Sequence, residues 1–176
     1  MKTKKIAINS LLASLSLILA QISHYLKVIP GIPMITLDIS DIPIFVSSLL
    51  FGSSSGYIIL ITVSCLRGFL FSSAGIPGII MRVLVTSISI FFLGIFYKSK
   101  KNFLLICILA SIFSTLIKLP INYFFWTKFF FMPNEWVKSI LFPIIAPVNL
   151  LKMFINIQLS YILSKKINNT WINHEK

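Results

Sequence analysis

The sequence predicts an all-α, polytopic membrane protein: a compact bundle of six transmembrane helices with its N- and C-termini on the cytoplasmic side. Of the 176 residues, 57% are hydrophobic and 11% are charged, whereas a soluble domain is about 45–50% apolar and about 25% charged. So few charged residues cannot form a water-exposed surface, and lipid must cover much of the outside. Because a spanning helix needs about 20 apolar residues, the chain has room for one bundle, and we expect a single domain over residues 1–176.

The first span is predicted at about residues 6–26, after Lys2, Lys4 and Lys5. A charged start followed by an apolar run is also typical of a signal peptide. This run, however, is long enough to span a membrane, and no small-residue cleavage site leads into a polar mature chain. We therefore expect a retained first helix. Two prolines in the next segment, KVIPGIPMITLDISD at 27–41, forbid a regular helix through its first half, so we expect it to lie over the bundle.

The other five spans are predicted at about residues 40–52, 57–72, 76–97, 103–125 and 137–164. The run at 40–52 is short: it crosses with help from the preceding residues, or it forms a shorter helix against the others. The stretch GSSSG at 52–56 predicts a tight turn, and KSKKN at 98–102 predicts an aqueous loop. The aromatic-rich residues 126–136 predict an interfacial segment, because Trp and Tyr favour the membrane–water interface.

The lysines assign the two sides of the membrane. With six crossings, one side collects nine lysines: Lys2, Lys4, Lys5, Lys98, Lys100, Lys101, Lys165, Lys166 and Lys176. The other side collects Lys27, Lys128 and Lys138. By the positive-inside rule the nine-lysine side is cytoplasmic. The sequence therefore predicts a multi-pass cell-membrane protein.

Several classes of function are disfavoured. A net charge of +12 would suggest nucleic acid on a soluble chain, but here the positive-inside rule explains the basic residues, and we expect no nucleic-acid partner. Cys65 and Cys107 lie inside apolar runs as small buried hydrophobes and, with His24 and His174, complete no metal site. There is no phosphate-binding loop, no pair of catalytic carboxylates and no Ser/His/Asp set. We expect no enzyme, no catalytic residue and no metal.

Polar side chains at membrane depth are costly and usually face the protein interior or a cavity. Asn149 and Lys152 are three residues apart and share one face of a helix. They follow Pro143 and Pro147, which we expect to loosen the helix and expose a carbonyl. The pair is either a ligand site, where an amide and a cation converge, or an inter-helix hydrogen bond beside a lysine that reaches the interface. The whole polar set is Arg67, Arg82, Lys118, Asn122, Asn149, Lys152 and Asn156.

Asn122 lies near the outer end of the fifth helix, with Lys118 one turn before it, and can either contact a ligand or join two helices. Small residues on the first helix, Ser10, Ala13 and Ser14, allow another helix to approach closely. That helix belongs either to the bundle itself or to another membrane subunit.

Two arginines and two aspartates lie near the outer rim. Arg67 and Arg82 flank the predicted outer loop, and we expect both to extend outward to the interface. Asp38 and Asp41 can pair with one of them across the rim. An exposed pair of this kind contributes only about 0–1 kcal/mol.

Four stretches carry a family resemblance: KKIAINSLLASLSLIL at 4–19, LDISDIPIFVSSLLFG at 37–52, GYIILITVSCLRGFLF at 56–71 and APVNLLK at 146–152. The sequence resembles the substrate-binding S components of energy-coupling factor (ECF) vitamin transporters, most closely the riboflavin-specific ones. Two details depart from the usual pattern. The turn reads GSSSG rather than Gly-Pro-x-x-Gly, and Ser10 and Ser14 stand for an Ala-xxx-Ala docking face. Both changes keep the residues small.

The resemblance implies a bacterial plasma-membrane subunit that binds one vitamin near its outer face, beneath the loop after the first helix. A transmembrane coupling subunit and two cytoplasmic ATPases would supply the energy. Riboflavin is then the transported ligand, and no cofactor is expected. The implied docking residues are Ser10, Ala13 and Ser14. The implied ligand contacts are Asn122, Asn149, Lys152, Thr36, Leu37, Asp38 and Ile39.

Two alternatives stay open. The SDIP stretch at 40–43 also occurs in S components for other vitamins, so thiamine or pantothenate can replace riboflavin. A ligand-free membrane scaffold is the alternative from another class. A scaffold has no need for Asn122, Asn149 and Lys152 to converge.

Overall fold

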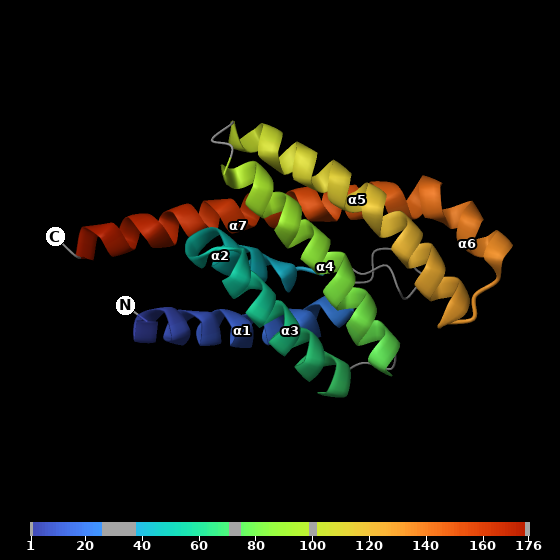
Figure 1. The fold of residues 1–176 in the computed structure, drawn as a ribbon, viewed down its shortest axis with the longest axis horizontal. Helices are drawn as coiled ribbons and strands as arrows, with labels where there is room; N and C mark the ends of the chain where they lie inside the picture. The colour runs from blue at the N-terminus through green and yellow to red at the C-terminus, as the bar shows by residue number, and fades with distance from the viewer. Residues whose placement is uncertain (1, 26–37, 71–74, 99–101, 175–176) are drawn as a thin grey trace.

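The computed structural model describes residues 2–25, 38–70, 75–98 and 102–174, and within these ranges the chain is helical without any strand (Figure 1). The all-α prediction is confirmed. The elements in order are α1 Lys2–Tyr25, α2 Asp41–Phe51, α3 Ser53–Leu70, α4 Gly75–Lys98, α5 Phe103–Lys128, α6 Asn134–Ile140, the π-helical turn η1 Leu141–Ile145 and α7 Ala146–His174.

Five of the six predicted spans correspond to helical segments long and apolar enough to cross a membrane. In the described part of the chain these are Thr3–Ser23, Ser53–Leu70, Gly75–Ile95, Phe103–Lys128 and Asn134–Asn169. The segment predicted at 40–52 is the 11-residue helix α2, shorter than the roughly 20 residues of a full crossing. Its residues 41–48 are all buried, as expected for a short helix packed among the others. The count of six crossings stays a prediction.

The helices extend beyond the predicted apolar runs. α1 begins at Lys2 instead of residue 6, α5 continues to Lys128, and α7 continues to His174 instead of ending at 164. Hydropathy marks the length that lipid covers, whereas a helix continues into water as long as its backbone hydrogen bonds hold. For the same reason the predicted interfacial segment 126–136 is helical at both ends, and only residues 129–133 lie outside helices.

The turn predicted over residues 52–56 is a single residue. Gly52 alone separates α2 from α3, and its φ of 91° is one that residues with a Cβ atom rarely adopt. Gly56 then lets the two helices approach closely, because a Cβ placed there would lie 2.9 Å from Ser48 Cβ. These two glycines fold α2 back against α3.

The core forms around α2, which packs against α1, α3 and α7. Its fully buried residues Ile44 and Phe45 contact a cluster that includes Leu60 of α3 and Ile157 of α7. Large apolar side chains are exposed on α1, α3, α4, α5 and α7, among them Leu11, Ile61, Phe91, Leu116 and Leu151. An apolar exterior of this kind suits a lipid environment.

Both termini lie at one end of the bundle, and α6 lies at the opposite end (Figure 1). α7 runs from the α6 end back toward the termini. Termini on one side are what an even number of crossings requires. The assignment of that side to the cytoplasm stays a prediction from the lysines.

Candidate functional site

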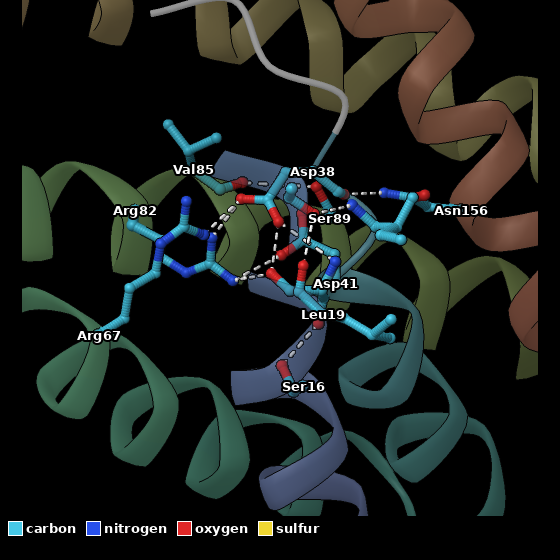
Figure 2. A network of polar contacts seen from close by, with 12 residues as sticks. Ser16, Leu19, Asp38, Asp41, Arg67, Arg82, Val85, Ser89 and Asn156 are labelled. Atoms are coloured by element: carbon cyan, nitrogen blue, oxygen red, sulfur yellow. Dashed lines mark hydrogen bonds and ion pairs between the residues drawn. The ribbon is translucent and has the colours of Figure 1, made fainter. Parts of the chain in front are cut away.

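A buried polar centre forms where the chain enters α2. Arg82 of α4 and Arg67 of α3 both point at the carboxylate of Asp38 (Figure 2). Their Nη1 atoms donate to the same Oδ2 atom, from 2.6 Å for Arg82 and 2.7 Å for Arg67. Arg82 Nη2 also donates to Ser40 Oγ at 2.8 Å and to Asp41 Oδ1 at 3.1 Å. The guanidinium of Arg82 therefore binds three residues at or just before the start of α2.

The backbone of the same segment is held by α1 and α7. Four of its backbone groups, in residues 38–42, bond to side chains of these two helices. The bonds run from Asn156 Nδ2 to Asp38 O (2.8 Å), from Ser16 Oγ to Ser40 O (2.6 Å), from Ser160 Oγ to Ile42 O (3.0 Å) and from Ile39 N to Ser23 Oγ (3.1 Å). Helices α1, α3, α4 and α7 thus all fix the short segment that leads into α2.

The expectation that both arginines extend outward is wrong. Only 14% of the Arg82 side chain and 21% of the Arg67 side chain are exposed, against 8% for Asp38. The buried carboxylates of Asp38 and Asp41 need cations nearby. This requirement outweighs the free energy that an arginine would gain by extending to the membrane–water interface. The predicted pairing of aspartate with arginine is confirmed. Because the pairs are buried, removing Arg82, which pairs with both aspartates, should cost about 3–5 kcal/mol rather than the small amount expected for an exposed pair.

Asp38 is held in its charged form. Burial acts to raise the pKa of Asp38, but the positive charges of Arg82, Lys152 and Arg67 outweigh it and hold the pKa well below its usual range. Lys152, predicted as a ligand contact, therefore lies within electrostatic reach of Asp38. The polar centre and the predicted ligand site are neighbours.

The other predicted ligand contacts that the structure describes lie on α5, on α7 and just before α2. Asn149 and Lys152 lie on α7 and are both half-buried, while Asn122 on α5 is 6% exposed. Within the described ranges no hydrogen bond joins Asn122 to Asn149. Ile39 packs against the main core. Thr36 and Leu37 lie outside the described residues.

Asn156 takes a role that the sequence did not assign. It was one of several polar residues at membrane depth, and the structure makes it the α7 anchor of Asp38. The available signal was helical spacing: Asn149, Lys152, Asn156 and Ser160 recur at intervals of three and four, which places them along one face of α7. That spacing indicates a polar face, but not which residue meets the ligand and which meets the backbone of the α2 entry.

The proposed docking residues divide between two faces of α1. Ser10 and Ser14 are exposed, and each donates to the carbonyl four residues earlier, at 3.0 Å. Ala13 is half-buried and packs against the main core. Only the two serines are free to meet another subunit through their side chains.

The helix departs from α-helical geometry around Pro143, as expected, and the predicted exposure of a carbonyl stays a prediction. Residues Leu141–Ile145 form a π-helical turn, and Ala146 N donates to Leu141 O, five residues back. Proline has no N–H and disturbs the ordinary helical bonding, and π turns occur frequently at functional sites. This turn begins the segment that carries Asn149 and Lys152.

A hollow of about 460 Å³ lies between α4 and α5. Every described residue that lines it is apolar: Ile80, Leu84, Pro120, Ile121, Phe124, Phe125 and Phe129. A vitamin site needs a few placed polar groups. The buried polar centre is therefore the better candidate.

These features define a class first: a multi-pass helical membrane protein whose polar groups gather inside the bundle, as in membrane-embedded binding and transport subunits. The family model described as "ECF transporter, substrate-specific component" matches residues 4–164. The chain belongs to this family of S components. The family description is that of the substrate-specific component of a transporter, not of an enzyme.

Individual relatives agree with this assignment. The chain is 30% identical over 129 residues to "Riboflavin transporter RibU" of Lactococcus lactis subsp. cremoris, in both strain NZ9000 and strain MG1363. The match covers 70% of this chain and 63% of those relatives. A solved S component of a bacterial ECF transporter superposes with a TM-score of 0.80, covering 97% of this chain and 99% of that one. At 23% identity, this second likeness shows the fold alone.

Proposed function

We propose that the protein is the riboflavin-binding subunit of an ECF transporter, which captures the vitamin at its outer side for ATP-driven uptake. The observation that carries the proposal is the buried polar centre, where Lys152 lies beside the Asp38 cluster and Asn149 lies one turn away on the same helix face. The 30% identity to a protein named as a riboflavin transporter supports the choice of vitamin.

The chemistry of a flavin suits these residues. Its flat ring system needs apolar and aromatic walls, and its pyrimidine edge alternates acceptors and donors. A side-chain amide offers a carbonyl and an NH2 group and can pair with that edge, a role that suits Asn149 or Asn122. The ribityl hydroxyls can accept hydrogen bonds from Lys152 or from backbone N–H groups.

Asp38 has a positioning role in this proposal. Both arginines and Ser40 bind its carboxylate, so the side chain has little capacity left for a ligand. Its rigid attachment would instead fix the start of α2 beside Lys152. The proposed ligand contacts are thus Asn122, Asn149 and Lys152, with the loop residues around Asp38.

The colour of the purified protein provides the first test. Protein made in bacteria should be yellow, and bound flavin fluorescence should be quenched. Protein that is colourless and does not bind added riboflavin would exclude the flavin assignment and leave another vitamin, or a scaffold without a ligand.

The site residues are tested by affinity in detergent. Asn149→Ala should weaken riboflavin binding about tenfold or more, because an unpaired buried partner costs about 1–3 kcal/mol and about 1.4 kcal/mol is a factor of ten. Asn122→Ala and Lys152→Ala should also weaken it. Asn168→Ala, an exposed position on the same helix as Asn149, serves as the matched control. Folded variants that bind like the wild type would place the pocket elsewhere.

Transport separates docking from binding. Ser10→Leu and Ser14→Leu should reduce riboflavin uptake in cells and leave riboflavin affinity unchanged, because both serines are exposed on α1. Thr62→Leu is a matched control, since Thr62 is an exposed residue on α3 that bonds its own helix in the same way. Equal loss of binding and uptake would assign the two serines to packing within the subunit.

A further inference from the structure

Lys118 is a buried basic residue that the site described so far does not use. It lies on α5 and is 3% exposed. Its ammonium contacts Met153 Sδ at 2.9 Å, and a thioether sulfur is only a weak acceptor for a group with three N–H donors. In the described part of the chain it has no other hydrogen-bond partner. A buried ion without good partners is costly, and an ionisable residue at membrane depth indicates a functional site.

Two more donors next to Lys118 have unmet hydrogen bonds. The hydroxyls of Ser114 and Thr115, three and four residues before it on α5, are buried and have no hydrogen-bond partner among the described residues. Ser89 of α4 reaches the same sulfur of Met153 at 3.9 Å. Groups from α4 and α5 therefore meet at Met153 of α7, and the hydroxyls of Ser114 and Thr115 keep hydrogen-bonding capacity that no described residue uses.

The charges around Lys118 leave an excess of positive charge. Lys118 interacts electrostatically with Asp41 and with Lys152, and Lys152 interacts with Asp38. The cluster has four basic side chains, Arg67, Arg82, Lys118 and Lys152, but only two carboxylates, Asp38 and Asp41. The arginines already bind both carboxylates. Neither lysine therefore has a carboxylate of its own, which disfavours a cationic ligand such as thiamine.

We propose that Lys118 contacts an anionic group of the ligand, with the Ser114 and Thr115 hydroxyls as further donors. Phosphate and carboxylate oxygens are the acceptors that ammonium groups bind most strongly. For the flavin of the proposed function, on which this inference rests, the anionic form is riboflavin 5′-phosphate. Lys118 would then set the preference between the phosphorylated and the free vitamin.

The test compares the two flavins on one variant. Wild type should bind riboflavin 5′-phosphate at least as tightly as riboflavin. In Lys118→Met the affinity for the phosphate ester should fall roughly tenfold to a hundredfold relative to that for riboflavin, as expected for one hydrogen bond between charged groups. Lys128→Met, at the exposed end of α5, is the matched control and should preserve the ratio of the two affinities.

Thermal unfolding of the ligand-free variants separates ligand recognition from a structural role. Lys118→Met removes a buried amine that has only a weak acceptor and adds a side chain that can pack against Met153, so its melting temperature should equal or exceed that of wild type. A lower melting temperature, with both flavin affinities reduced by the same factor, would make Lys118 a structural residue and overturn the inference.

Failure of the proposed function has a different signature. Wild type that binds riboflavin but excludes its phosphate ester overturns the inference alone. If wild type binds neither flavin, the riboflavin assignment is wrong. Binding of pantothenate, whose carboxylate would then be the anionic group, is measured instead to test the contact with Lys118. Pantothenate binding that weakens in Lys118→Met supports the anion contact, and absent pantothenate binding overturns it.

Discussion

Arg82 should be the most sensitive single residue of the polar centre. Arg82→Met removes hydrogen bonds of 2.6, 2.8 and 3.1 Å and leaves Asp41 without its ion-pair partner. Breaking a buried ion pair from one side costs about 3–5 kcal/mol, a large part of a typical stability of about 5–15 kcal/mol. Arg67→Met removes one bond of 2.7 Å from a more exposed side chain, and should cost about 1.5–3 kcal/mol.

Unfolding in mixed detergent micelles, followed by circular dichroism, measures these differences. Lys138→Met is the control, because the Lys138–Glu135 pair is 3.8 Å long and mostly exposed, and should change stability by about 0–1 kcal/mol. Neutralising the acids as well, in Asp38→Asn/Asp41→Asn/Arg82→Met, should recover part of the loss, since no buried carboxylate then lacks its cation. An Arg82→Met effect no larger than that of Lys138→Met, or no recovery in the triple variant, would refute this account of the polar centre.

Three further changes test neighbouring features. Acid should destabilise the protein, because the pKa of Asp38 is lowered on folding. The contribution of Asp38 to stability is complete above the pKa of the unfolded chain, about 3.9. It is lost as the pH falls below that value, since the unfolded chain takes up the proton first. Asp38→Asn should flatten the dependence of unfolding free energy on pH, and an unchanged slope would contradict the assignment. Asn156→Ala leaves the backbone carbonyl of Asp38 unpaired, so it should lower the free energy of unfolding by about 1–3 kcal/mol. It should also speed flavin release, measured by stopped-flow fluorescence. The control Asn168→Ala should change neither quantity. Gly56→Leu should force α2 and α3 apart and cost about 1–3 kcal/mol in the same unfolding assay, and a loss no greater than that of Thr62→Leu would argue against tight packing there.

Hydropathy and charge predicted the helices well because lipid imposes its requirements residue by residue. An apolar run of spanning length must be helical, and the runs that became α3, α4 and α5 were found on that basis. The short run at 40–52 was ambiguous, since its fate depends on whether other helices surround it. Only packing decides that the eight residues from Asp41 to Ser48 are buried on every side.

The direction of the arginines could not be predicted for a related reason. Arg67 and Arg82 lie near the ends of their apolar runs, where a long side chain can reach either the interface or the interior. The choice depends on the rotation of α3 and α4 about their own axes, which brings both residues toward Asp38. Sequence spacing fixes which residues of a helix share a face, as with Asn149 and Lys152, but not which neighbour that face meets.

The π turn at Leu141–Ile145 has a consequence for how related sequences should be aligned. A π turn holds one residue more than an α turn, and each residue rotates a helix by about 100°. Removing one residue there would allow ordinary α-helical bonding, but it would swing Asn156 and Ser160 away from the backbone groups they hold. The number of residues between Val137, which is buried in the core, and Asn156 is therefore constrained by the packing. A homologue that is one residue shorter there should be aligned with its gap inside this helix rather than in a loop.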